Sequence, residues 1–329
     1  MEDVRSEGAA IGSDRTSLGI LKGPPPPADG PQKISTSQSD LYEGLAEVAC
    51  TLYKHSLTVL PPDVRTALGS ATGRETDRQG RMRLQIMVDA VNTSDRTGII
   101  VCQDTGIPVF FLGLGTEFPV NGARLQEAMS SGIALATERF SLRSSVVHPL
   151  NRTNPQTSTG RGVPIFHIEF LDGADWLDLL LVPKGSGSEN MSFLAMLTPA
   201  DGIAGVKRFV LDSVVRAGAK PCPPTIVGVG LGGTADECMA LAKRAIARPV
   251  GQPHPEQDIA ELERQLRDAL NATGIGPQGL GGLTTAFAVH IEYGYTHISM
   301  NPVAVNIQCW RGERARAKVY VDGKVEYGF

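Results

Sequence analysis

Glycine-rich segments follow apolar stretches at three places in the second half of this chain of 329 residues. They are KGSGSENMS at 184–192, GVGLGG at 228–233 and GIGPQGLGG at 274–282, the last with five glycines in nine residues. Glycine loses more backbone entropy on folding than any other residue, so a segment this rich in glycine is normally held against another part of the protein. We therefore expect close backbone packing at these places.

Between these segments, hydrophobic periodicity switches between helical and strand-like stretches without a regular βαβ alternation. The pattern predicts a mixed α/β (α+β) fold, in which a helical N-terminal part precedes a β-rich lobe. The expected elements include a strand–turn–strand at 101–115, a β-hairpin at 163–185 through Asp172-Gly173, and a helix at 75–93 with Met82, Ile86, Met87 and Ala90 turned inward.

Composition excludes several classes of function. The formal net charge is −4, which gives no electrostatic reason to expect nucleic acid or an anionic membrane as a partner. No apolar run approaches the ~20 residues of a membrane span, and the opening MEDVRSEGAA lacks the apolar stretch of a secretory signal. Five cysteines, odd in number and far apart, do not resemble a disulfide framework, so a cytoplasmic location is expected.

The first 36 residues differ from the rest. Four consecutive prolines, with glycine and polar residues around them, bury too little apolar surface to offset the entropy of ordering. We expect residues 1–36 to form a disordered leader, and residues 37–329 to form one catalytic domain. A ligand for a proline-recognition module is the alternative role of the proline run.

Three cysteines occupy similar places in the pattern. Cys102 ends a predicted strand before a turn, Cys222 directly precedes a strand and Cys309 ends one, with separations of 120 and 87 residues that fit no local zinc motif. Thiols at strand ends can converge at one edge of a sheet and hold a metal, although each is equally a buried thiol beside a turn. Cys50 and Cys238 fall inside helical stripes and are expected to be small core residues.

The glycine-rich segments and one histidine each have two interpretations. The loop at 184–192 could cradle an anion with its backbone N–H groups or could be a flexible surface turn. GVGLGG matches a dinucleotide-binding pattern only weakly, because it lies late in the chain and no acidic partner is evident downstream. His297, twelve residues before Cys309, is either a structural histidine or a catalytic one.

Six motifs, taken in order, resemble one family. CQDTG, KGSGSENMS, CPPTIVGVGLGGT, GIGPQGLGGLTTA, AVHIE and PVAVNIQC are similar to the N-terminal region of iron–sulfur class I fumarases and to the α subunit of two-subunit fumarate or tartrate dehydratases. The resemblance runs from about residue 40 to residue 317. So many long motifs in a single order make it far more specific than any one glycine pattern.

The resemblance implies a [4Fe–4S] cluster on Cys102, Cys222 and Cys309. Three thiolates leave one iron without a protein ligand, and that iron can act as a Lewis acid on hydroxyl and carboxylate oxygens; the enzyme should be oxygen-sensitive. The resemblance also implies acid–base roles for Asp104 and His297, and substrate contacts from Gln103, Arg143, Gly185, Ser186 and Gly187.

The resemblance further implies a hydro-lyase that adds water to a C4 dicarboxylate, first of all fumarate to malate as in the tricarboxylic acid cycle. L(+)-tartrate dehydratase or mesaconase is the alternative, since 151–164 is closer to the tartrate type and SENMS to the fumarase type. The chain ends soon after Cys309, so a β subunit with the C-terminal-type domain, and hence a hetero-oligomer, is expected. Ser186 replaces a glycine usual in the family loop, which predicts an altered backbone or substrate preference.

Two other classes of protein remain open from the residues alone. An iron–sulfur sensor or assembly protein would keep the three cysteines without needing Asp104, Arg143 or His297. A nucleotide-binding protein would use 228–233 and bind nucleotide without iron.

Overall fold

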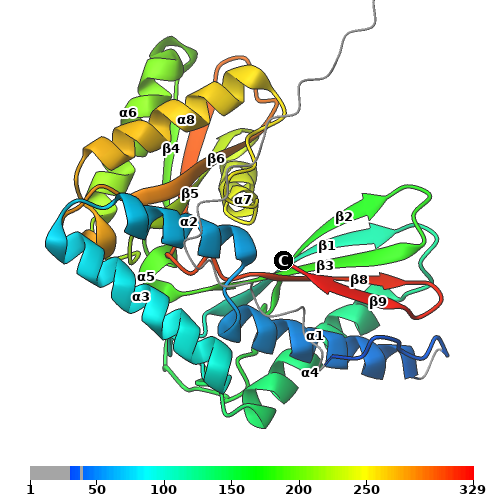
Figure 1. The fold of residues 1–329 in the computed structure, drawn as a ribbon. Helices are drawn as coiled ribbons and strands as arrows, with labels where there is room; N and C mark the ends of the chain where they lie inside the picture. Colours follow the sequence, from blue (N-terminus) through cyan, green and yellow to red (C-terminus); the bar gives the residue numbers. More distant parts are fainter. Residues whose placement is uncertain (1–29, 38–39) are drawn as a thin grey trace, which may run out of the picture.

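Two β-sheets organise the protein in the computed structural model, which describes residues 30–37 and 40–329. One sheet has five strands in the order β2–β1–β3–β8–β9, and the other has four in the order β4–β7–β5–β6. Figure 1 shows the two sheets in separate lobes, with helices covering each. The predicted mixed α/β fold is confirmed.

The bounds of the elements are as follows. The helices are α1 (Asp40–Thr58), α2 (Pro62–Arg74), α3 (Arg78–Thr97), α4 (Gly122–Arg139), α5 (Ser186–Glu189), α6 (Gly202–Ala217), α7 (Ala235–Ala245) and α8 (Gln257–Ala272). The strands are β1 (Ile107–Gly115), β2 (Ile165–Leu171), β3 (Trp176–Lys184), β4 (Phe193–Leu197), β5 (Thr225–Gly232), β6 (Ala286–Gly294), β7 (Asn301–Gln308), β8 (Ala315–Tyr320) and β9 (Val325–Gly328).

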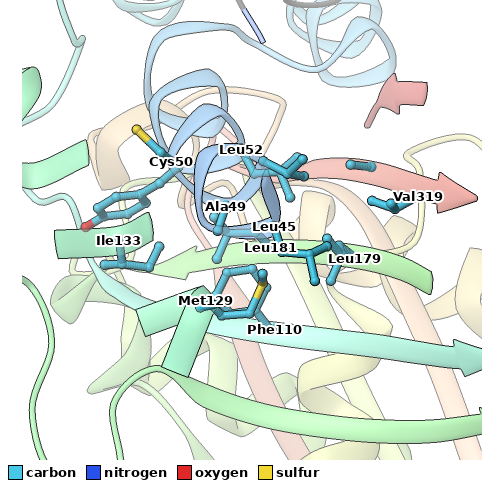
Figure 2. Close-up of a cluster of buried hydrophobic side chains, with 14 of the residues drawn as sticks. Leu45, Ala49, Cys50, Leu52, Phe110, Met129, Ile133, Leu179, Leu181 and Val319 are labelled. Atoms are coloured by element: carbon cyan, nitrogen blue, oxygen red, sulfur yellow. The ribbon is translucent and has the colours of Figure 1, made fainter. Parts of the chain in front are cut away.

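Helices α1 and α4 cover one face of the five-stranded sheet. Leu45 of α1 and Met129 of α4 pack with Phe110 and Leu179 of the strands below them, as Figure 2 shows. Gly132 lets the two helices approach closely, because a Cβ atom there would lie 2.6 Å from Cβ of Ala49. This cluster is the larger hydrophobic core of the described residues, and it packs β1 and β3 against α1 and α4.

The predicted hairpin at 163–185 is wrong in its pairing. Strands β2 and β3 flank the turn, but β1 lies between them, pairing parallel with β2 and antiparallel with β3. The physical reason is that β1 is strongly apolar and is stabilised by neighbours on both sides, whereas β2 is half-exposed and takes the edge of the sheet. Central placement of β1 aligns Ile107 with Lys184, which decides the geometry of the site below.

The second lobe is built around β5. Helices α6 and α8 cover one face of its sheet, and α7 covers the other, where it also meets the five-stranded sheet through Val182 and Ile246. Gly228 and Gly230 lie under α7, where a Cβ atom would overlap Ala242 O or Cys238 O. The glycines of GVGLGG therefore serve helix packing, and α7 fills the space that a phosphate would need at those positions.

The helix expected over 75–93 forms as α3, and its predicted inward face is confirmed at Met87 but wrong at Met82 and Ile86. Met82 and Ile86 are 57% and 59% exposed, while Leu84, Met87 and Val91 are buried. The helix begins after its Asp77 cap, and residues at spacings of three and four from Leu84 face the core. No helix within the described residues is long and apolar enough to cross a membrane.

The leader boundary also needs correction. Residues 1–29, including the proline run, lie outside the described residues. Residues 30–36 pack along the β8–β9 hairpin: Ile34 N–H donates to Gly323 O at 2.8 Å, Val325 N–H donates to Gln32 O at 2.9 Å, and Ile34 is buried. The prediction of a disordered leader is therefore wrong for residues 30–36.

Candidate active site

The turn that carries Cys102 and Asp104 is held by the residue that follows them. The Tyr53 hydroxyl donates to Thr105 O at 3.1 Å, and the Thr105 hydroxyl donates to Arg143 O at 2.5 Å. Thr105 is fully buried, so these bonds anchor the turn and bring the backbone of Arg143 beside it. The strand expected before the turn does not form; β1 begins only at Ile107.

The loop after β3 lies directly against this turn, because Ile107 and Lys184 are partners in the sheet. Ser186 donates to Asp104 Oδ2 from its backbone N–H at 2.7 Å and from its hydroxyl at 3.1 Å. A Cβ atom on Gly185 would lie 2.9 Å from the same oxygen, so only glycine allows the carboxylate to sit there. Asp104 and the loop thus form one unit.

Cys222 lies on the next segment around the site. A Cβ atom on Gly187 would lie 2.7 Å from Lys220 O, which places the Cys222 segment against the loop. Cys222 has a φ of 56°, a left-handed conformation that costs free energy for any residue with a side chain. Such strain persists only where neighbours impose it and is typical of functional sites.

The segment at 274–282 supplies part of that support. Gln278 N–H donates to Pro223 O at 2.8 Å, and Leu283 N–H donates to the buried Glu75 carboxylate at 2.8 Å. Two acceptors, one from the Cys222 segment and one from the C-cap of α2, therefore hold this segment. The expectation that it packs against another part of the protein is confirmed.

Cys309 completes the group of thiol-bearing segments. Trp310 N–H donates to Cys222 O at 3.2 Å, so the backbones after β7 and before β5 touch. The Cys309 thiol lies 3.9 Å from Glu313 Oε2, and Glu313 is paired with Arg311 at 2.9 Å, all largely shielded from water. Contacts thus connect the segments of all three cysteines through Asp104, the 185–187 loop and Trp310.

Lys184 links the two sheets behind this group. Its ammonium, only 1% exposed, donates to Ile307 O at 2.5 Å, to Gln308 Oε1 at 3.0 Å and to the Ser188 hydroxyl at 3.2 Å. Burial lowers the pKa of Lys184 to about 8, partly offset by the Glu189 carboxylate 3.7 Å away. The end of β3 is therefore fixed to the end of β7, one residue before Cys309.

The electrostatics of the thiols agree with these contacts. Desolvation by neighbouring atoms raises the pKa of Cys222, and the nearby charges of Cys102 and Asp104 raise it further. Burial, followed by the Glu313 carboxylate, raises the pKa of Cys309. Both thiols are therefore protonated at neutral pH without a metal, and a metal would have to displace these protons.

The three thiols can be compared with the ligands of an iron–sulfur cluster. None of the cysteines in the described residues forms a disulfide, and Cys102 and Cys222 are exposed. No group of three or more His, Cys, Asp or Glu side chains in that part of the chain is placed to hold one metal ion. A four-iron cluster spaces its thiolates more widely, because each binds a different iron, so the three thiols fit that cofactor in number and chemistry.

The remaining predicted residues are placed as follows. Gln103 and Arg143 are exposed beside the turn. His297 is exposed in the loop between β6 and β7, where its Nδ1 accepts from Ser299 N–H at 3.2 Å. Cys309 follows the other end of β7, about 25 Å away along the strand, so the chain does not bring His297 to the three cysteines. Cys50 and Cys238 are buried in α1 and α7, as expected.

Sequence reasoning missed the residues that support the site. Glu75, Lys184, Arg311 and Glu313 are almost fully buried charges that contact the backbone or each other. The available signal was a charged residue beside each motif: Lys184 opens the glycine loop, and Arg311 and Glu313 follow Cys309 directly. Charged side chains are rarely buried without a partner. The sequence does not show that these residues are buried, so their hydrogen bonds and ion pairs could be recognised only in the structure.

Comparisons with known proteins decide the family. The family model described as Fumarate hydratase (Fumerase) matches residues 46–318. The chain belongs to this fumarase family. A protein of Methanocaldococcus jannaschii, provisionally named L(+)-tartrate dehydratase subunit alpha, is 40% identical over 285 residues, covering 85% of this chain and 99% of its own length.

Bacterial relatives agree with that result. The L(+)-tartrate dehydratase subunit alpha of Escherichia coli (strain UTI89 / UPEC) is 32% identical over 278 residues, covering 84% of this chain and 91% of its own. The protein of the same name from Shigella sonnei (strain Ss046) is similar to the same degree. The predicted resemblance is confirmed, and the names within the family are those of hydro-lyases.

Proposed function

We propose that this chain is the α subunit of a [4Fe–4S]-dependent hydro-lyase that reversibly adds water to a C4 dicarboxylate, with fumarate as its first candidate substrate. The observation that carries the proposal is the set of contacts joining the three cysteine segments to Asp104 within a member of the fumarase family. A core whose only task was folding would not need three free cysteines on connected loops around a half-buried carboxylate.

Cys102, Cys222 and Cys309 would hold the cluster. When bound, it supplies a Lewis-acidic iron to the substrate's hydroxyl and carboxylate oxygens. The Arg311–Glu313 pair, 2.9 Å apart, and the Trp310 N–H bond to Cys222 O keep two of the thiol segments in register. Support of this kind orients a metal ligand through its neighbours.

Asp104 is the acid–base group of the proposal. Elimination of water removes a proton from a carbon next to a carboxylate, and hydration returns it, so a group must hold that proton. Both hydrogen bonds to Asp104 reach Oδ2, which leaves Oδ1 to exchange the proton. His297 has no contact with Asp104 in this chain, so an acid–base role for His297 stays a prediction.

The substrate's negative charges need donors. Arg143 is exposed and its backbone is anchored beside Asp104 by Thr105, so its guanidinium can pair with one carboxylate. The backbone N–H of Ser186 is taken up by Asp104, so the N–H groups of Gly185 and Gly187 in the same loop are the candidates for binding the second carboxylate. In this proposal, Oδ1 of Asp104 faces the carbons between the two carboxylates of a four-carbon diacid.

L(+)-tartrate is the second candidate substrate. Relatives at 32–40% identity, each covered over nine-tenths or more of its length, are named L(+)-tartrate dehydratase subunit alpha. Tartrate carries one hydroxyl more than malate, so a site for it must also accommodate that group. Mesaconate, a methylated fumarate, tests the space available at the double bond.

The test is anaerobic assembly of the chain with its β subunit, followed by assays of fumarate, L(+)-tartrate and mesaconate. Iron and sulfide contents are measured for Cys102→Ala and for the matched control Cys238→Ala, which removes a buried thiol far from the site. We expect loss of cluster in the first variant alone, and loss of turnover with retained cluster in Asp104→Asn. A loaded assembly that turns over none of the three acids would support the sensor or assembly protein instead.

A further inference from the structure

Among the residues that the structure describes, one residue alone hydrogen-bonds to the Asp104 carboxylate, and it does so on one oxygen. Oδ2 accepts the backbone N–H of Ser186 at 2.7 Å and its hydroxyl at 3.1 Å, across 82 residues of sequence. Within residues 30–37 and 40–329, no group hydrogen-bonds to Oδ1. The carboxylate is therefore fixed at one end and open at the other.

The fixed end is tightly enclosed. Gly185 has no side chain, and a Cβ atom there would lie 2.9 Å from Oδ2, so the carboxylate reaches the backbone of the loop. The Ser186 N–H is free for this purpose because the first N–H groups of a helix have no partner within the helix, and Ser186 opens α5. The N–H bond would exist with almost any residue at 186, whereas the hydroxyl bond requires Ser or Thr.

The hydroxyl's only proton is already committed. A serine hydroxyl has one O–H donor, and that of Ser186 points to Asp104, so it cannot also donate to a substrate carboxylate. We propose that Ser186 is a positioning residue for Asp104 and not a substrate ligand: it holds Oδ2 so that Oδ1 faces the substrate. This inference rests on the proposed function, in which Asp104 exchanges a proton with the substrate.

The position of Asp104 relative to the thiols supports this direction. Asp104 follows Cys102 by two residues, and the loop that binds Asp104 packs at Gly187 against Lys220 O, two residues before Cys222, so the carboxylate lies beside the thiol segments. A carboxylate free to rotate would place either oxygen there. The two bonds from Ser186 to a single oxygen remove that freedom, which is how a neighbouring residue prepares a catalytic group.

The kinetic test uses the assembled enzyme and three variants at one position. Ser186→Ala removes the hydroxyl and keeps the N–H bond, so we expect kcat to fall about tenfold, the effect of one hydrogen bond to a charged group, with KM changed less than twofold. Ser186→Thr keeps the hydroxyl and should restore kcat. The control is Thr66→Ala, an exposed hydroxyl on α2 that bonds only to Pro62 O and should have no effect.

A higher KM with unchanged kcat in Ser186→Ala would show that Ser186 binds substrate and would overturn the proposal. Crystal structures of the wild-type and Ser186→Ala assemblies provide a readout that needs no turnover. We expect one Asp104 conformer in the first and several in the second; a single unchanged conformer in both would refute the positioning role. If the wild type acts on none of the acids tested, the proposed function fails while this comparison still tests the position of Asp104.

Discussion

Glu75 offers a direct test of how the glycine-rich segment supports Cys222. Its carboxylate is fully buried and accepts the N–H groups of Asp77 at 3.0 Å and Leu283 at 2.8 Å, one on each oxygen. In Glu75→Gln one oxygen becomes an NH₂ group that faces a donor, so one bond is lost. A hydrogen bond to a charged group contributes about 1.5–3 kcal/mol, so the free energy of unfolding should fall by about 2 kcal/mol.

For a chain of this size, that loss corresponds to a fall in Tm of roughly 3 °C. Hydrogen exchange measured by mass spectrometry locates the effect: peptides covering 274–283 and 219–224 should exchange faster, because Gln278 N–H donates to Pro223 O. A peptide from α4 should not change. Glu127→Gln, an exposed carboxylate on α4, is the matched control. Unchanged exchange over 274–283 would refute the supporting role of Glu75.

Two further changes test the packing around the site. Burial lowers the pKa of Lys184 from 10.5 to about 8, so between these pH values the folded state binds fewer protons than the unfolded state. The free energy of unfolding of the wild type should therefore rise by about 3 kcal/mol from pH 8 to pH 10.5, relative to that of Lys184→Met. Urea unfolding at several pH values measures both proteins, and the same pH dependence in the two would contradict this prediction. Gly228→Ala forces α7 away from β5 and should cost about 3 kcal/mol, whereas Gly69→Ala on α2, with open space around it, should be neutral or slightly stabilising in the same denaturation assay.

The chemistry of the site was more predictable from the sequence than its connections. The motifs around Cys102, Cys222 and Cys309 identified the family, and the strand-end positions predicted for Cys222 and Cys309 are confirmed, whereas the strand expected to end at Cys102 does not form. Strand order was not predictable, because a turn such as Asp172-Gly173 reverses the chain without deciding which strand pairs with which. Insertion of β1 between β2 and β3 depends on contacts about 55 residues apart.

Buried charges were also beyond sequence reasoning. Lys184 ends an apolar strand and Glu75 lies between polar residues, and only the folded structure shows that distant backbone groups accept from or donate to them. Ser186 shows the same limit in the site itself. Serine in place of the usual glycine predicted an altered loop backbone, yet the φ of Ser186 lies outside the left-handed region. The Ser186 hydroxyl instead bonds to Asp104, a partner that no local sequence pattern identifies.

The exposure of the site leads to the last prediction, that this chain alone turns over little substrate. Gln103, Arg143, Ser186, Cys102 and Cys222 are all exposed, whereas charge stabilisation in a hydro-lyase is strongest where water is excluded. A partner that covers these residues would both enclose the substrate and protect the proposed cluster. The name subunit alpha, carried by relatives that this chain matches over most of their length, agrees with such a partner.

We therefore expect the isolated chain to bind iron and sulfide, to lose them rapidly in air or with a chelator, and to show at most about one-hundredth of the turnover of the assembly with its β subunit. The measurement is anaerobic activity against the molar ratio of β subunit added, with cluster content followed in parallel. Activity should rise and level off at a fixed ratio, while cluster lability falls at the same ratio. Full turnover by the pure chain would mean that residues 1–329 already enclose the substrate, and the argument from exposure would be wrong.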